Sequence, residues 1–146
     1  MDITYERAEV SDIPEIFRLC RELILKWEDD KSLDLEKVLR WCENKITKNI
    51  SQYRRIICDG RLAGFYRFFE TDEGWEIDDL YVLQKFQGRG IGTFTVKKCL
   101  EEGENVFLYV FSKNQGTVRL YSSLGFEISE KVSPTRYIMR YKGEKI

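Results

Sequence analysis

Three glycines alternate within six residues of this chain, directly after an apolar stretch. The segment Gln87-Gly88-Arg89-Gly90-Ile91-Gly92 follows a strand pattern that ends near Leu83, and a helical pattern comes after it. Glycine has no Cβ atom, so the backbone can come close to a ligand there. The first turn of a helix adds unpaired N–H groups and a partial positive charge. A strand, a glycine loop and a helix in this order predict a pocket for a pyrophosphate.

Two common phosphate motifs do not fit this spacing. The motif G-x-G-x-x-G requires glycine where Thr93 stands, and G-x-x-x-x-G-K-[ST] has no matching lysine. The mismatches weaken both a dinucleotide and an ATP interpretation. A glycine turn that caps a helix and binds nothing is the plain alternative. Three glycines in five residues are more than a turn requires, so the loop favours ligand binding.

The spacing of apolar residues divides the rest of the chain into strands and helices. We expect a strand at 2–8, a helix to Trp27 with Ser11 as N-cap, and a helix at about 34–48. Turns at 59–60 and 72–74 divide 53–83 into three antiparallel strands. A helix from Arg89 to about 102, a strand at 106–111, a helix at 114–123 and strands at 126–131 and 137–141 follow. The strands ending at 83 and 111 are expected to be parallel, because their connection is long enough for a crossover helix.

Composition narrows the class of function. A chain of 146 residues, 42% hydrophobic and 34% charged, is expected to form one domain, 1–146, with a packed core. Its 24 basic and 25 acidic residues give a net charge of −1 and no basic field for nucleic acid. There is neither a membrane-span pattern nor a signal-peptide pattern, so we expect a cytoplasmic protein without a membrane partner. Without histidine or a C-x-x-C pair, no metal site and no His-based triad are expected.

Two segments carry a resemblance to a known family. Gln87-x-x-Gly90-x-Gly92 resembles the Q/R-x-x-G-x-G/A signature of the GNAT superfamily of N-acetyltransferases, and the strand at 76–82 is similar to that family's fourth strand. The segment 114–126 is similar to the family's N-x-x-A-x-x-L-Y-x-x-x-G-F helix, with Thr117 at the usual alanine. The resemblance is specific over 75–126. It implies an α/β (α+β) fold, with a mixed, mostly antiparallel sheet of six to seven strands, about four flanking helices, and a splayed parallel strand pair that forms the CoA cleft.

The resemblance also implies an activity and a cosubstrate. The protein would be an acetyl-CoA-dependent acyltransferase that moves an acetyl group directly to a primary amine, of a small molecule or a protein, in a ternary complex. The pantetheine arm would bond to the strand backbone as an added strand does, and the pyrophosphate would rest on N–H groups of the loop. Asn114 would cap its helix and meet the pantetheine. The implied cofactor-binding residues are Leu80, Tyr81, Val82, Gln87, Gly88, Arg89, Gly90, Ile91, Gly92, Thr93, Asn114 and Tyr121.

Three chemical tasks accompany direct transfer. The resemblance places Glu76 where histone-type members of the family carry their catalytic glutamate, so Glu76 is our first choice for the base, ahead of Asp78 and Asp79. Walls of Trp75, Tyr81 or Phe68 could raise the pKa of such a carboxylate. Strand carboxylates more often only solvate a sheet face, and many relatives use ordered water instead. The backbone N–H near Val82 would stabilise the oxyanion, redirected by a strand bulge. Tyr121 would protonate the leaving thiolate, although a packed core tyrosine is its plain alternative.

The sequence does not select one acceptor for the acetyl group. Many acids, including Glu70, Asp72 and Glu73, make a cationic amine chemically reasonable, and the cluster 27–30 could attract one, although a solvated helix end explains it as well. Two other functions stay open. One is a non-catalytic acyl-CoA-binding or regulatory module, and the other is transfer of a larger acyl group into a pocket near Phe65, Phe68 or Phe111. The four cysteines are assigned to structure, and a homodimer is compatible with the sequence.

Overall fold

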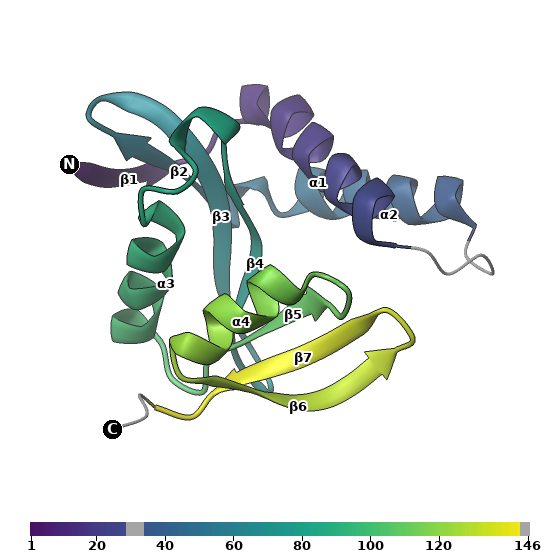
Figure 1. Cartoon of the computed structure of the whole chain (residues 1–146). Coiled ribbons are helices and arrows are strands. Elements are labelled where there is room, and N and C mark those ends of the chain that lie inside the picture. Colours follow the sequence, from purple (N-terminus) through teal and green to yellow (C-terminus); the bar gives the residue numbers. More distant parts are fainter. Residues whose placement is uncertain (29–33, 144–146) are drawn as a thin grey trace.

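The computed structural model describes residues 1–28 and 34–143, and these form one seven-stranded sheet with helices on both faces (Figure 1). The strands lie in the order β1-β2-β3-β4-β5-β7-β6, and only the β4–β5 pair is parallel. The mixed, mostly antiparallel sheet predicted above is therefore confirmed. The strands are β1 (Ile3–Arg7), β2 (Tyr53–Cys58), β3 (Arg61–Thr71), β4 (Gly74–Val82), β5 (Phe107–Phe111), β6 (Phe126–Ser133) and β7 (Arg136–Tyr141).

Four α-helices cover the sheet, two on each face. α1 (Ile13–Trp27) and α2 (Leu35–Lys48) enclose one core with β2, β3 and β4, which is centred on Ile16, Ile46 and Phe65. α3 (Ile91–Glu102) and α4 (Gln115–Ser123) enclose the other, which includes Val96 and Phe126. In the part of the chain that the structure describes, three 3-10 turns join these elements: Val10–Asp12, Ile50–Gln52 and Gln84–Phe86. Within residues 1–28 and 34–143, no helix is long and apolar enough to span a membrane.

Two helix starts differ from the sequence prediction. Ser11 is not the N-cap of α1, because it lies inside the 3-10 turn Val10–Asp12 and Asp12 precedes the helix. The carboxylate of Asp12 instead accepts a hydrogen bond of 2.8 Å from the backbone N–H of Glu9. α3 begins at Ile91 rather than Arg89, since Gly90 has a left-handed φ of 80° and interrupts the helical backbone. Of the acidic cluster at 27–30, Asp29 and Asp30 lie outside the described residues.

The parallel strand pair splays almost as soon as it forms. β4 and β5 are paired only at Glu76–Phe107 and Ile77–Leu108. Beyond these pairs the two strands diverge. β5 continues along β7, whereas β4 remains beside β3 (Figure 1). β4 stays close to β3 because Gly64 has no side chain: a Cβ atom there would lie 2.0 Å from the carbonyl oxygen of Tyr81. The splay predicted for the cleft is thus present.

Candidate active site

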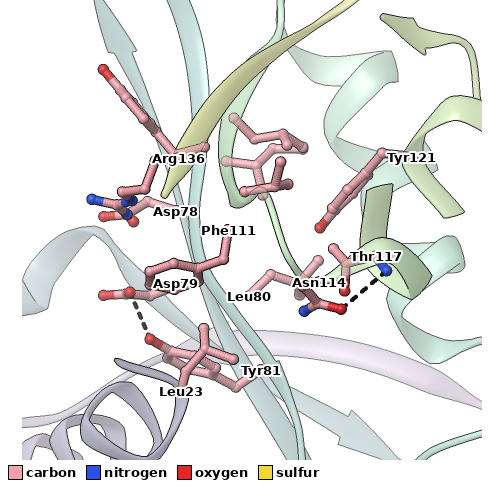
Figure 2. Close-up of a pocket in the computed structure, with 14 residues that line it drawn as sticks. Leu23, Asp78, Asp79, Leu80, Tyr81, Phe111, Asn114, Thr117, Tyr121 and Arg136 are labelled. Carbon is pink, nitrogen blue, oxygen red and sulfur yellow. Dashed lines mark hydrogen bonds between the residues drawn. The ribbon is translucent and has the colours of Figure 1, made fainter. Parts of the chain in front are cut away.

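A cavity of about 160 Å³ lies where β4 and β5 diverge. Its walls come from both strands, from α4 and from the first residue of β7 (Figure 2). In the described chain, the segment 78–82 of β4 has no ladder partner on its β5 side, whereas β3 pairs with its other side. Unpaired strand backbone beside a cavity is what an extended ligand arm needs in order to bond as an added strand. The sequence-predicted residues Leu80, Tyr81, Asn114 and Tyr121 all line this cavity.

A bulge in β4 shapes this wall. Phe65 of β3 lies opposite Tyr81 and Arg67 lies opposite Asp78, so one residue of β3 faces both Asp79 and Leu80. Asp79 has a φ of 48°, which is unusual for a residue other than glycine. The extra residue changes the alternation of the strand: Asp78 and Tyr81 line the space beside α1 and α2, and Leu80 packs with the core beneath α3 and α4.

The backbone of Val82 is directed towards the cleft. Leu83 donates its N–H to the carbonyl of Ala63 in a bond of 2.7 Å, so the preceding residue points its polar groups away from β3. The side chain of Gln87 confirms this direction, because its Nε2 donates to the Val82 carbonyl at 3.0 Å. Gln87 therefore fastens the glycine loop to the end of β4, and the Val82 N–H remains on the cleft side.

A buried charge network fixes the bulge from the α2 side. The Asp79 carboxylate accepts hydrogen bonds from the Tyr53 hydroxyl at 2.6 Å and the Tyr81 hydroxyl at 2.7 Å, and the Lys45 ammonium lies 3.0 Å away. Asp78 accepts from Lys45 at 3.1 Å and from Arg67 at 3.2 Å. Burial is the main cause that raises the pKa of Asp78, and the neighbouring Asp79 charge adds to it. Both aspartates are already engaged, which makes them positioning groups rather than free bases.

Glu76 differs from these aspartates in having no such partner. Its carboxylate makes no hydrogen bond or ion pair with any residue of the described chain, and its backbone lies between Phe69 of β3 and Phe107 of β5. Burial, and then the charge of Asp78, raises the pKa of Glu76 to about 7. Of the aromatic neighbours expected from the sequence, Trp75 and Phe68 instead pack against each other beside Gly103, at the end of α3, and Tyr81 lines the space beside α1 and α2.

The position of Glu76 sets a limit on its chemistry. Glu76 does not line the cavity, but Asp78, two residues further along the same strand face, and Tyr109 do line it. Tyr109 lies two residues after Phe107, the β5 partner of Glu76, and the negative charge of Glu76 contributes, after burial, to raising the pKa of the Tyr109 phenol. A carboxylate beside the cavity rather than in it can exchange a proton with a bound amine through one water molecule.

Tyr121 projects from α4 into the cavity. Its side chain is 9% exposed, and its ring packs edge-on against Phe126 at 5.6 Å. In the described residues the hydroxyl has no hydrogen-bond partner, and Figure 2 shows it directed towards the space between Leu80 and Asn114. Burial is the largest cause that raises the pKa of this phenol, so it keeps its proton at any working pH. Tyr121 is therefore both a packed core residue and an available donor.

Asn114 holds the start of α4 at the same cavity. Its side-chain oxygen accepts a hydrogen bond from the Thr117 N–H at 3.3 Å, which is the N-cap role predicted from the sequence (Figure 2). Asn114 and Thr117 both line the cavity. The cap thereby fixes the helix that carries Tyr121 about two turns further on.

The glycine loop ends in an open helix N-terminus. Gly88 and Gly90 have φ values of 78° and 80°, and a Cβ atom at either would meet nothing within 4 Å. The N–H of Phe94 is the first that bonds within α3, to the carbonyl of Gly90, so the three N–H groups from Ile91 to Thr93 have no helical acceptor. Arg89 stacks over the Phe86 ring at 5.2 Å and stays exposed. The loop presents N–H groups, positive charge and free space together.

A second, larger cavity of about 590 Å³ adjoins the first. It lies between α1, α2 and the start of β7, and the two cavities share part of their walls, including Asp78, Tyr81, Phe111 and Arg136. Sequence reasoning missed Lys45, Arg136 and this cavity, because no motif links α2 or β7 to the glycine loop. Cys20 and Cys42 line it too; all four cysteines of the chain are buried free thiols.

Comparison with known proteins agrees with this geometry. The family model described as acetyltransferase (GNAT) family matches residues 13–126. The chain belongs to this family. An uncharacterised N-acetyltransferase of Methanocaldococcus jannaschii is 38% identical to it over 82 residues, which are 53% of this chain and 35% of that protein. The chain thus spans about a third of the length of this curated relative.

Solved structures of family members show the same fold. The PaiA N-acetyltransferase of Thermoplasma acidophilum, in complex with coenzyme A, has a TM-score of 0.71 and 18% identity, with coverage of 97% of this chain and 99% of that one. The N-acetylglutamate synthase of Neisseria gonorrhoeae, complexed with coenzyme A and N-acetyl-glutamate, has a TM-score of 0.65 and 19% identity over 97% of this chain and 35% of that one. Among the described residues, no group of three or more His, Cys, Asp or Glu side chains is placed to hold a metal ion.

Proposed function

We propose that this protein binds acetyl-CoA in the β4–β5 cleft and transfers the acetyl group directly to a primary amine. One observation carries the proposal: the cavity between the splayed strands is bordered by unpaired β4 backbone and by Tyr121 and Asn114 of α4. The glycine loop continues from the same strand and ends in the open N-terminus of α3. The coenzyme A complexes of two family members with this fold add support.

Each part of the cosubstrate has a matching group on the chain. The pantetheine amides would bond to the β4 backbone at Leu80, Tyr81 and Val82, beside Asn114. The pyrophosphate would accept hydrogen bonds from the free N–H groups of Ile91, Gly92 and Thr93, with Gly88, Arg89 and Gly90 shaping the loop. The Gln87 N–H is already bonded to the Gln84 carbonyl at 3.3 Å, so Gln87 would anchor the loop rather than hold phosphate.

The reaction proceeds in one ternary complex, in which the acetyl group passes directly from the thioester to the amine. The neutral amine nitrogen attacks the thioester carbonyl carbon, the new C–N bond forms, and the C–S bond breaks with its electron pair going to sulfur. The Val82 N–H stabilises the oxyanion of the tetrahedral intermediate. Glu76, ionised above its pKa of about 7, takes the amine proton through a water molecule. Tyr121 gives its proton to the sulfur as the C–S bond breaks, and the resulting phenolate regains a proton from solvent.

The size of the cleft bears on the acyl group. A cavity of about 160 Å³ that must also hold the end of the pantetheine arm favours a short acyl chain such as acetyl. Of the three phenylalanines expected near a larger acyl pocket, only Phe111 lines this cavity. Phe65 is fully buried in the core beneath α1 and α2, and Phe68 packs on Trp75.

A transfer assay tests the function against a non-catalytic binding module. The purified protein is mixed with acetyl-CoA and a panel of amines, free CoA thiol is measured, and acetylated amine is identified by mass spectrometry. The proposal expects thiol release that depends on both the amine and the hydroxyl of Tyr121. A protein that binds acetyl-CoA but acetylates no amine, with Tyr121→Phe equal to wild type, would instead be a binding module.

A further inference from the structure

Arg136 stands at the junction of the two cavities. It is the first residue of β7, and it lines both the β4–β5 cleft and the larger cavity beside α1 and α2. Its guanidinium lies over two aromatic rings of β5, at 5.5 Å from the centre of Tyr109 and 5.2 Å from that of Phe111. Figure 2 shows Arg136 and Asp78 on one side of the cleft and Tyr121 on the other. A group bound by Arg136 would therefore lie next to the place where the thioester and the amine meet.

A second arginine of the same strand shows what is unusual about Arg136. Arg140 lies four residues along β7 on the same face, and it also stacks on a ring of β5, that of Phe107 at 4.8 Å. Arg140 is paired with the Glu73 carboxylate at 3.5 Å and lines neither cavity. Within the described residues, Arg136 has no carboxylate partner and faces the cavities. One arginine is thus satisfied by the protein, and the other is left for a ligand.

Basic side chains balance the two buried aspartates of the larger cavity. Asp78 and Asp79 are balanced by Lys45 and Arg67 in the network described above. The remaining charged residues of this wall besides Arg136 are Glu28 and Lys37, one of each sign. The acids that suggested a cationic acceptor, Glu70, Asp72 and Glu73, line neither cavity. The wall is therefore not negative, with Glu28, Asp78 and Asp79 against Lys37, Lys45 and Arg136, and Arg136 is a cation that the network leaves without a carboxylate partner in the described chain.

Much of the rest of this wall is apolar, besides the hydroxyl groups of Ser133 and Thr135. Its wall includes Leu23 and Ile24 of α1, Val38 and Trp41 of α2, and Phe111 of β5. Its volume of about 590 Å³ lies within the range of about 300–1,000 Å³ that is usual for small-molecule sites. An acceptor that fits would bury a hydrocarbon or aromatic group between the helices while its polar end reaches the cleft.

We propose that the acceptor is a small amino carboxylate with an apolar side chain, whose carboxylate binds Arg136 and whose amine faces the thioester. The proposal rests on the acetyl-CoA-dependent transfer proposed above and names its substrate class. Arginine suits this task because its planar guanidinium presents paired donors that match a carboxylate. The amine of such a substrate, held beside the carboxylate, would enter the region walled by Asp78, Tyr81 and Phe111 that both cavities share.

The test compares amines that differ only in the carboxylate. kcat/KM is measured for phenylalanine against phenethylamine and for leucine against isoamylamine, with spermidine as the polycation. We expect the carboxylated member of each pair to be preferred about 10- to 100-fold, the effect of a hydrogen-bonded charge pair. Arg136→Gln should abolish that preference, because the rate with the carboxylated member of each pair should fall more than the rate with its decarboxylated partner. Arg136→Lys should restore part of the preference, and Arg140→Gln, the matched control, should retain all of it.

Three results would overturn the proposal. Phenethylamine or spermidine could be acetylated as fast as the amino acids, Arg136→Gln could keep the preference, or neither amino acid could be acetylated by a protein that binds acetyl-CoA. Acetyl-CoA binding is measured separately by thermal unfolding. Its absence would overturn the proposed function itself, whereas its presence without amino acid turnover would overturn only the substrate class.

Discussion

The proposed site has two halves, a cofactor half and an acceptor half, and they are built on different principles. The cofactor half, made of the β4 edge, the glycine loop and the start of α3, presents backbone groups at 78–82 and 91–93. The acceptor half, between α1, α2 and β7, presents side chains: the network around Lys45 and the exposed Arg136. Backbone groups recognise a ligand that is the same for a whole family, whereas side chains can change from member to member without altering the fold.

The largest expected effect comes from a substitution in the acceptor half. Lys45→Met removes the ammonium shared by Asp78 and Asp79 and leaves two buried carboxylates with only Arg67 as a cation. Leaving a buried charge without its partner should lower the free energy of unfolding by about 3 kcal/mol. Urea denaturation measures this free energy of unfolding. Arg40→Met, on the same helix but in an exposed pair with Glu36, should change it by less than about 0.5 kcal/mol. Equal losses in the free energy of unfolding of both variants would contradict the burial of the network around Lys45.

The next effect separates chemistry from cofactor binding. Tyr121→Phe removes the proposed proton donor without changing the ring, so kcat should fall about 100-fold while the acetyl-CoA dissociation constant stays the same. Steady-state kinetics measure kcat, and a binding titration measures the dissociation constant. Tyr141→Phe is the matched control, because Tyr141 packs edge-on against the same Phe126 ring, at 5.5 Å, but does not line the cavity. A normal kcat for Tyr121→Phe would assign Tyr121 to packing alone.

A smaller effect concerns Glu76 and pH. With a pKa raised to about 7, Glu76 acts as a base only when ionised, so kcat should rise with pH through about 7. Glu76→Gln should lower the high-pH rate about tenfold and remove this step from the profile. A profile that keeps the step in Glu76→Gln would assign it to the amine substrate.

The same group gives a signature in stability that needs no substrate. Between its ordinary pKa of 4.5 and about 7, the folded protein holds a proton on Glu76 that the unfolded chain has lost. Wild type should therefore lose stability relative to Glu76→Gln as pH rises across this window, and the difference should be constant above it. Denaturation at a series of pH values measures the difference. A flat difference would mean that Glu76 is not desolvated.

The smallest effect lies in the cofactor half. Asn114→Ala removes the oxygen that accepts the Thr117 N–H and should cost about 1 kcal/mol of stability. Affinity for acetyl-CoA should fall as well, because Asn114 lines the cleft. Gln115→Ala, one residue further along and outside the cavity lining, is the control. An unchanged affinity in Asn114→Ala would limit Asn114 to capping.

The contrast between the halves also explains what the sequence could predict. Gly88, Gly90 and the capping Asn114 have local geometric roles, so their spacing specifies the loop and the two helix starts, although α3 begins two residues late. Lys45 and Asp79 are 34 positions apart and are joined only by packing of α2 on β4, which no local pattern encodes. The neighbours of Glu76 depend on strand register and on a bulge, and a shift of one residue exchanges the two faces of a strand.

The most direct test of the central claim is thermal unfolding with and without acetyl-CoA in Gly90→Ala and Gly60→Ala. Both glycines have open space at the Cβ position and φ values of 80° and 79°, so either alanine should strain the backbone by about 1–2 kcal/mol. Only Gly90 lies at the proposed pyrophosphate site. We expect a hundredfold excess of acetyl-CoA over its dissociation constant to stabilise wild type and Gly60→Ala by about 2.7 kcal/mol, and Gly90→Ala by much less. No stabilisation of wild type at millimolar acetyl-CoA, or equal stabilisation of both variants, would contradict the account.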